Sequence, residues 1–426
     1  MKKGTDCAQL PNVLNLDYEN SFWQLFTTKN GTFYLYSAYY DIRPRSPAPT
    51  MRILSMSNTL NPTVPVSCQI WFNNRNDPEI AKVVNYRLLW EPSWGTGARI
   101  YPYSIECEVP TVNGQNLVPV AVSLVENICD TATNLIKVTH NALKPGEKKS
   151  LAVCVKRMYF VNEEPIFKLI EYLELVRILG AEKVYMYVLE PQQSAKIEKI
   201  FRYYEAQGLL EVSRITIPGQ RPNLPILRHL YIKKHLHLEW MFENIPTNDC
   251  LYKSFYRHDL IANIDLDEVI IPENGLSWRQ MIQKVVVSSK DTPYSTITTR
   301  NSYYPINFPK PKNWNPGVPP QFPMLNTIRR LTKYSKPLHS AKSFFNTENV
   351  IVSHSHWALS CLGQQCSRLD VPTEIATSHH YRPFGPDQFA NQDVISNATV
   401  ADYSLWKWKD QLVAKCVEAA RDLDFL

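Results

Sequence analysis

Short apolar and aromatic runs, separated by Asn, Pro and Gly, fill the first third of the chain. Runs of this kind, recurring about every ten residues, are typical of short β-strands in a sandwich. A polar, turn-rich segment at residues 141–150 then predicts a boundary. We therefore expect a β-sandwich-like N-terminal domain over residues 1–148. Its candidate strands are residues 31–43, 64–72, 83–91, 99–109, 117–124 and 135–140.

After residue 150 the pattern changes to apolar strands that alternate with amphipathic stretches. In residues 163–180 the apolar positions recur with the period of a helix, and Gly180 ends the stretch. This alternation predicts an α/β domain over residues 149–426 with a mostly parallel, Rossmann-like sheet, whose ligands bind beyond the carboxyl ends of the strands. The predicted strands are residues 151–160, 183–190, 210–218 and 259–272. The predicted helices are residues 163–180, 194–209 and 225–245.

Charge and apolar runs exclude two classes of partner. The chain of 426 residues has 46 basic and 40 acidic residues without a long Lys/Arg run, so we expect no nucleic-acid partner. Because no stretch approaches ~18 apolar residues, we expect no membrane span. The start of the chain has no apolar stretch typical of a signal peptide.

Cysteines and glycosylation patterns point to a secretory compartment. None of the nine cysteines forms a Cys-x-x-Cys pair, which argues against a zinc site. They could form up to four disulfides with one left over, or several could be buried free thiols. Asn30-Gly31-Thr32 and Asn397-Ala398-Thr399 fit the N-glycosylation pattern.

The tripeptide Asp-Leu-Asp occurs twice, in very different surroundings. Asp265 and Asp267 lie near the end of the predicted strand 259–272, where residues i and i+2 face the same side. Two such carboxylates repel each other unless a cation joins them, and oxygen ligands suit Mn²⁺ or Mg²⁺, which can also bind a diphosphate. A solvated turn is the alternative. Asp422 and Asp424 follow a helical pattern at the chain end, where we expect a solvated helix terminus.

Two motifs around these residues resemble glycosyltransferase family 92. They are NDCLYKSFYRHDLIANIDLDEVIIP at residues 248–272 and TSHHYRP at 377–383. The resemblance spans roughly residues 150–400. It implies a GT-A fold and an inverting glycosyltransferase with a nucleotide-sugar donor. Characterised members resemble β-1,4-galactosyltransferases that use UDP-galactose and act on terminal galactose or core fucose of glycoprotein glycans. They are type II Golgi proteins, so we expect a Golgi-lumen location and a membrane anchor absent from this chain.

Inverting transfer needs groups for the metal, the diphosphate and the acceptor proton. Asp265 and Asp267 are the predicted metal ligands, and His354 or His356, at i and i+2 of a predicted strand, could complete the shell. Each of these histidines could equally be a hydrogen-bonded core residue. The sequence does not identify the general base. The candidates, each of which could instead be a surface carboxylate, are Glu374 first, then Asp393 and Asp370.

Basic and polar groups near the predicted strand ends are candidates for the donor site. Arg382 could clamp the diphosphate, or form a structural salt bridge. Lys156 and Arg157 end the first strand, where the crevice would bring them near phosphates or leave them solvated. Asn248 and Asp249 could line the uridine pocket, or form a helix C-cap.

Other readings remain open. Aromatic residues in the Pro-rich segment 301–323 could shape an acceptor site or pack over the core. A secreted carbohydrate-binding or adhesion module would need no nucleotide. A glycoside hydrolase fits poorly, because its two carboxyl groups flank the scissile bond instead of facing one side. The oligomeric state does not follow from the sequence.

Overall fold

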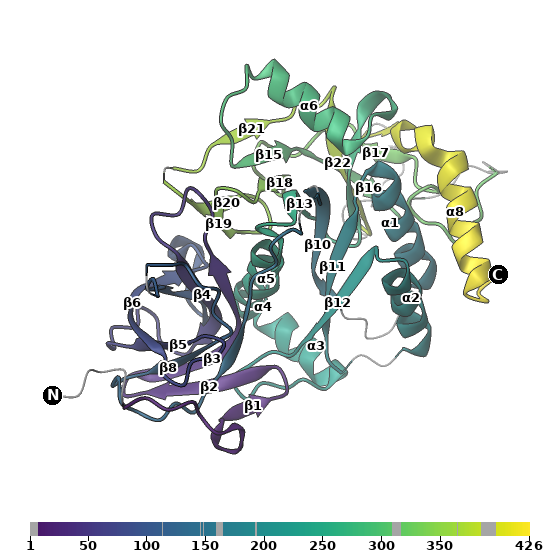
Figure 1. Cartoon of the computed structure of the whole chain (residues 1–426). Coiled ribbons are helices and arrows are strands. Elements are labelled where there is room, and N and C mark those ends of the chain that lie inside the picture. Colours follow the sequence, from purple (N-terminus) through teal and green to yellow (C-terminus); the bar gives the residue numbers. More distant parts are fainter. Residues whose placement is uncertain are drawn as a thin grey trace.

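The computed structural model describes residues 7–426 with the exception of 113, 145, 148, 159–164, 192–193, 309–316, 364 and 385–397. An all-β region at the N-terminus, purple to blue in Figure 1, packs beside an α/β region that follows it in the chain. The strands of the first region are β1 Tyr18–Asn20, β2 Trp23–Thr28, β3 Gly31–Asp41, β4 Thr50–Ser57, β5 Ser67–Trp71, β6 Glu79–Leu88, β7 Tyr101–Glu108, β8 Ala121–Val125 and β9 Ile136–Thr139.

These strands form a closed barrel and not the expected sandwich. Their order is β1-β2-β3-β4-β7-β6-β5-β8-β9, and β9 also pairs with β3, which closes seven of them into a ring. The cause lies in β3, whose register shifts between Leu35 and Ser37. Before this bulge β3 pairs with β2, and after it Ala38 and Tyr39 pair with β9. Because a bulge bends a strand, β3 can pair with both β2 and β9. The second pairing closes the sheet, so the barrel lacks the open edges that a sandwich would have.

Strand β4 was not predicted, because every one of its residues is buried and it shows no polar alternation. Met51 and Ile53 pack into the barrel core, whereas Leu54 and Met56 pack against the α/β region. A single apolar cluster therefore crosses from the barrel into the α/β region. The two parts share a core, although the sequence suggested a boundary near residue 148.

The α/β region is built on a mixed sheet of order β12-β11-β10-β13-β18-β15-β21. Its first four strands are parallel neighbours, which confirms the mostly parallel sheet with interleaved helices. A smaller sheet of order β14-β22-β16 lies beside it. The strands are β10 Ser150–Met158, β11 Lys183–Leu189, β12 Leu210–Ile215, β13 His258–Asn263, β14 Glu268–Pro272, β15 Thr296–Thr299, β16 Asn301–Pro305, β17 Arg329–Leu331, β18 Lys342–Asn346, β19 Val350–Ser353, β20 Ala358–Cys361, β21 Arg368–Asp370, β22 Ala376–Arg382 and β23 Thr399–Ala401.

Helices cover both faces of this sheet. Helices α1, α2 and α8 share one apolar cluster with the sheet, and α3, α4 and α5 belong to the cluster that reaches the barrel (Figure 1). The predicted helix 225–245 breaks at His235 into α3 and α4. Gly180 ends α1 in the left-handed conformation, as predicted. The helices are α1 Ile166–Leu179, α2 Ala195–Ala206, α3 Pro225–Lys234, α4 Leu236–Phe242, α5 Asn244–Ser254, α6 Trp278–Ser288 and α8 Lys409–Asp422.

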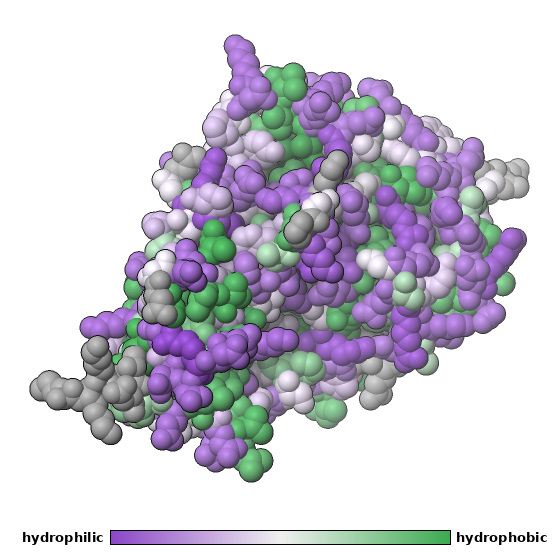
Figure 2. All heavy atoms as spheres, in the orientation of Figure 1, coloured by the Kyte–Doolittle hydropathy of each residue, from purple (hydrophilic) through white to green (hydrophobic). Residues whose placement is uncertain are grey.

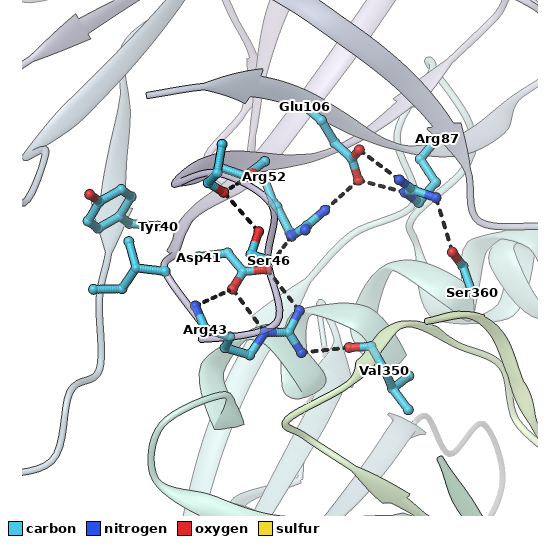
Figure 3. Close-up of polar contacts among 12 residues, drawn as sticks. Tyr40, Asp41, Arg43, Ser46, Arg52, Arg87, Glu106, Val350 and Ser360 are labelled. Carbon is cyan, nitrogen blue, oxygen red and sulfur yellow. Dashed lines mark hydrogen bonds and ion pairs between the residues drawn. The ribbon is translucent and has the colours of Figure 1, made fainter. Parts of the chain in front are cut away.

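A buried polar network fastens the barrel to the α/β region (Figure 3). Asp41 accepts hydrogen bonds from Arg43 and Arg52, and Arg52 also contacts Glu106. Arg43 Nη1 then donates to the carbonyl oxygens of Thr347 and Val350, at 2.6 and 2.8 Å. Each charged side chain of this network has an opposite charge beside it, which offsets the free-energy cost of removing the ions from water.

Four disulfides are present: Cys7–Cys129, Cys68–Cys107, Cys154–Cys250 and Cys361–Cys366. Cys416 is a buried free thiol, so the expectation of four bridges with one cysteine left over is confirmed. Disulfides persist in oxidising compartments, and this set points to the secretory pathway.

The face of the molecule drawn in Figure 2 is mainly polar. Hydrophilic residues cover most of the face drawn in Figure 2, and hydrophobic ones appear between them in small groups. Within the described residues, no helix combines the length and the apolar character needed to cross a membrane. Asn30, of the first glycosylation pattern, is exposed at the β2–β3 turn, whereas Asn397 lies outside the described residues.

Acid should destabilise the fold in part through His258. Its ring contacts Ser150 Oγ at 2.6 Å and Tyr185 Oη at 3.0 Å, and burial lowers its pKa to about 4. As the pH falls, the His258 ring therefore becomes protonated in the unfolded chain before it does so in the folded protein. The stabilisation by the neutral, buried ring is complete above pH ~6.5 and is lost as the pH falls towards 4. The loss in the free energy of unfolding is about 3 kcal/mol. We expect His258→Gln to flatten the pH dependence of the urea midpoint between pH 7 and 4. His339→Gln, at an exposed histidine, should keep the wild-type slope, and equal slopes for both variants would contradict the assignment.

Candidate active site

The first Asp-Leu-Asp tripeptide lies in a turn and not within a continuous strand. The predicted strand 259–272 splits into β13 and β14, because the chain passes here from the large sheet to the small one. Leu266 is buried, whereas the side chains of Asp265 and Asp267 are 32% and 34% exposed. The turn follows the carboxyl end of β13, where ligands of such sheets bind. Burial of the leucine anchors the turn and leaves both carboxylates open to a ligand.

Two lysines contact the first carboxylate. Asp265 Oδ2 lies 2.9 Å from Lys342 Nζ and 3.5 Å from Lys156 Nζ. Lys342 is buried and also reaches Glu268 Oε2 at 2.5 Å. Burial would lower the pKa of Lys342, but Asp265 and Glu268 raise it above its ordinary value, so it stays charged. The lysine thus fixes Asp265 and Glu268 relative to each other.

A histidine contacts the second carboxylate. His380, on β22 opposite Glu268, places Nδ1 at 2.8 Å from Glu268 Oε1 and Nε2 at 3.6 Å from Asp267 Oδ2. Burial would lower the pKa of His380, but hydrogen bonds to Asp267 and Glu268 raise it to about 9. The imidazole is therefore protonated at neutral pH. Glu268 is held between His380 and Lys342 by these two contacts.

The residues of this turn fit a divalent metal of the Mg²⁺ or Mn²⁺ type. Asp265 and Asp267 supply hard oxygen donors, and such ions are usually bound through one or two carboxylates together with substrate phosphates and water. Across the part of the chain that the structure describes, no three His, Cys, Asp or Glu side chains converge to hold a metal by themselves. A metal at this turn would therefore take its remaining ligands from diphosphate and water.

His354 and His356 do not lie on a strand. They occupy the connection between β19 and β20 and line a pocket of about 400 Å³ that also includes Lys156. Burial lowers the pKa of each to about 3, so both rings are neutral. His356 Nδ1 donates to the carbonyl oxygen of Ala341 at 2.8 Å, which leaves Nε2 as the nitrogen with a lone pair. This tautomer would allow His356 to bind a metal through Nε2. Within the described residues, however, the two histidines do not form a metal-binding cluster with the carboxylates.

Two of the three basic candidates, Lys156 and Arg382, lie near the ends of strands that border the acidic turn. Lys156 lies two residues before Met158, the last residue of β10, and contacts Asp265. The side chain of Arg157 lies outside the described residues. Arg382 is exposed two residues after His380 on β22. Because residues i and i+2 of a strand share a face, Arg382 leaves β22 on the side that holds His380 and Asp267. Its position is compatible with the predicted diphosphate contact.

Asn248 and Asp249 are buried within α5, and their contacts are with protein. Asn248 Nδ2 donates to the carbonyl oxygen of Ser353, and Asp249 accepts from Tyr39 and Tyr187. Neither residue is a helix C-cap, because α5 continues to Ser254. These contacts hold β19 and the barrel against α5. A role of the two residues at a uridine pocket stays a prediction.

Of the three carboxylates proposed as general base, Glu374 and Asp370 lie away from the motif. Glu374 is exposed before β22, and the β14–β22 register puts Ala376 opposite Pro272, about 13 Å along the strand from His380. Asp370 is a surface residue paired with Arg368 on the edge strand β21. Asp393 lies outside the described residues.

The aromatic segment 301–323 divides between core and site. Tyr304 and Phe322 are buried, and Tyr304 stacks on His379. Tyr303 lies with its ring centroid 5.4 Å from that of His380. Residues 309–316 lie outside the described part of the chain.

The sequence analysis did not predict the contacts that Lys342 and His380 make with the acidic turn. Only the family motif around residues 377–383 gave a signal for His380, and nothing near Lys342 in the sequence gave one.

Comparison with known proteins agrees with this geometry. No curated protein matches the chain. The sequence profile of glycosyltransferase family 92 matches residues 149–416, more than half of the chain, and covers β10, the acidic turn and β22. The chain belongs to glycosyltransferase family 92.

Proposed function

We propose that the protein transfers galactose from UDP-galactose, with inversion, in β-1,4 linkage to a terminal galactose or core fucose of a glycoprotein glycan. Membership of family 92 supplies the glycosyltransferase activity. The observation that carries the proposal further is the turn Asp265–Asp267 at the carboxyl end of β13, flanked by Lys156 and Lys342. This arrangement favours a diphosphate donor bound with a metal.

The residues of the turn have distinct roles in this proposal. Asp265 and Asp267 would hold Mn²⁺ or Mg²⁺, which when bound offsets the charge that develops on the departing diphosphate. Lys342 and His380 hold the two carboxylates in place through their contacts with Asp265 and Asp267. Arg382 binds diphosphate oxygens from the end of β22, since a guanidinium matches them in bidentate fashion.

A Golgi-lumen location, in a type II membrane protein, completes the proposal. The four disulfides and the exposed Asn30 support this setting, because both features belong to secretory proteins.

The deciding experiment is transfer from a panel of UDP-sugars, with and without Mn²⁺, to galactose- and fucose-terminated acceptors. We expect metal-dependent transfer from UDP-galactose, with a β-1,4 linkage in the NMR spectrum of the product. Transfer from a different UDP-sugar would exclude the donor assignment. Isothermal titration with UDP and Mn²⁺ separates the enzyme from a carbohydrate-binding module, because a module without catalysis needs no metal-linked UDP binding.

A further inference from the structure

The barrel contributes side chains to a pocket beside the acidic turn. We propose that this pocket binds a pyranose unit of the acceptor glycan, a substrate assignment that rests on the proposed transferase function. Its volume of about 400 Å³ falls in the range of small-molecule sites. The lining residues are Trp90, Trp94, Lys156, Glu239, Trp240, Glu243, His354, Ser355, His356 and Trp357.

Indole rings from both parts of the protein form the apolar walls. Trp94 comes from the β6–β7 connection of the barrel, and Trp357 comes from the β19–β20 connection. Their ring centroids are 5.7 Å apart, and Trp94 also lies 4.8 Å from His354. Flat aromatic faces stack on the C–H face of a pyranose, since both surfaces are apolar. Four tryptophans around one cavity are therefore suited to a sugar ring.

The polar groups of the pocket favour a neutral polyol over an anion. Glu239 and Glu243 supply acceptors for hydroxyl groups, and Lys156 is the single cationic side chain among the lining residues. Lys156 Nζ is paired with Glu243 Oε2 at 2.8 Å, which offsets its attraction for a second anion. A diphosphate would face two carboxylates here, at an electrostatic cost that uncharged hydroxyl groups do not incur.

Lys156 also connects the pocket to the donor side. The same ammonium that contacts Glu243 lies 3.5 Å from Asp265 Oδ2. The Lys156 side chain therefore lies between a sugar in the pocket and the turn that is proposed to hold the diphosphate. This position is the one that an acceptor needs, because its hydroxyl must reach the anomeric carbon as the diphosphate departs.

The barrel loop is held in position before any ligand binds. Trp90 Nε1 donates to the carbonyl oxygen of Gly95 at 2.8 Å. Gly95 has a φ of 111°, and a Cβ there would come within 2.7 Å of His237 on α4. The glycine lets the loop approach the α/β region closely, and this close packing places Trp94 at the pocket. Preorganisation of this kind lowers the entropic cost of binding.

The proposal is tested by Trp94→Ala and Trp357→Leu, one variant from each wall. We expect each to raise the acceptor KM at least tenfold while the donor KM and UDP–Mn²⁺ binding stay unchanged. Tyr18→Ala, which removes an exposed aromatic of β1 outside the pocket, should keep the wild-type acceptor KM. Circular dichroism checks that each variant is folded, and two variants keep the test decisive if one of them is not.

Direct binding separates this proposal from the proposed transferase function. Methyl β-galactoside and methyl α-fucoside are titrated against wild type and Asp265→Ala, followed by tryptophan fluorescence and by NMR of the glycoside. Binding of either probe to both proteins, and its loss in Trp94→Ala and Trp357→Leu, supports the subsite even if no transfer is found. Unchanged glycoside binding in both folded variants, or loss of UDP binding in them, overturns it.

Discussion

Replacing Asp265 or Asp267 by alanine should lower kcat/KM for sugar transfer by about a thousandfold. Stabilising the charge of a departing diphosphate through a metal contributes several kcal/mol, and about 4 kcal/mol corresponds to that factor. Both variants should fold, because Lys342 and His380 each keep their contact with Glu268. The measurement is transfer from UDP-galactose at saturating Mn²⁺, with the urea midpoint as a check of folding.

The second copy of the tripeptide provides the matched control. Asp422 accepts a hydrogen bond from Tyr203, and Asp424 pairs with Lys199 at the exposed end of α8. Alanine at either position should leave kcat/KM at the wild-type value, because exposed pairs contribute little. Full activity of Asp267→Ala in the presence of a chelator would refute the metal role.

Replacing Asp41 by alanine should lower the free energy of unfolding by about 3–5 kcal/mol. Arg43 and Arg52 both contact this carboxylate, and all three side chains are buried. Burial would raise the pKa of Asp41, but the two guanidiniums hold it well below its ordinary value. Arg52 keeps Glu106 in the variant, whereas Arg43 is left beside backbone carbonyls as a buried charge without a carboxylate.

Urea unfolding with the disulfides intact measures this effect. Glu79→Ala is the matched control, because it removes the partly exposed ion pair with Arg75 on the same barrel and should change stability by less than about 1 kcal/mol. A loss below 1 kcal/mol for Asp41→Ala would show that the network at the barrel interface is not needed for the fold.

Local patterns predicted the α/β region well. The apolar stripe of α1 and its stop at Gly180 are properties of neighbouring residues, so the sequence contains them directly. The same holds for β10 and β11, whose apolar runs were read within a few residues of their bounds. The split of residues 259–272 was not visible, because Ile264 and Leu266 are as apolar in the turn as they would be in a strand.

Long-range pairing was the part that local patterns could not supply. Closure of the barrel depends on β9 meeting β3 about a hundred residues earlier in the chain, and the register of that contact leaves no mark on either strand. The same limit applied to the carboxylates: Glu374 was a reasonable base by its position in the sequence, but the β14–β22 register carries it away from the turn.

The sequence by itself determined the alternation of strands and helices after residue 150 and the number of possible disulfides, and it predicted a metal site at Asp265 and Asp267. These features depend on residue type and short spacing. Only the tertiary structure decided that Lys342, His380 and Lys156 surround the acidic turn, and that Trp94 of the barrel faces Trp357 across a pocket. The physical reason is that ion pairs and aromatic contacts act over a few ångströms of space, between residues that the chain separates by up to hundreds of positions.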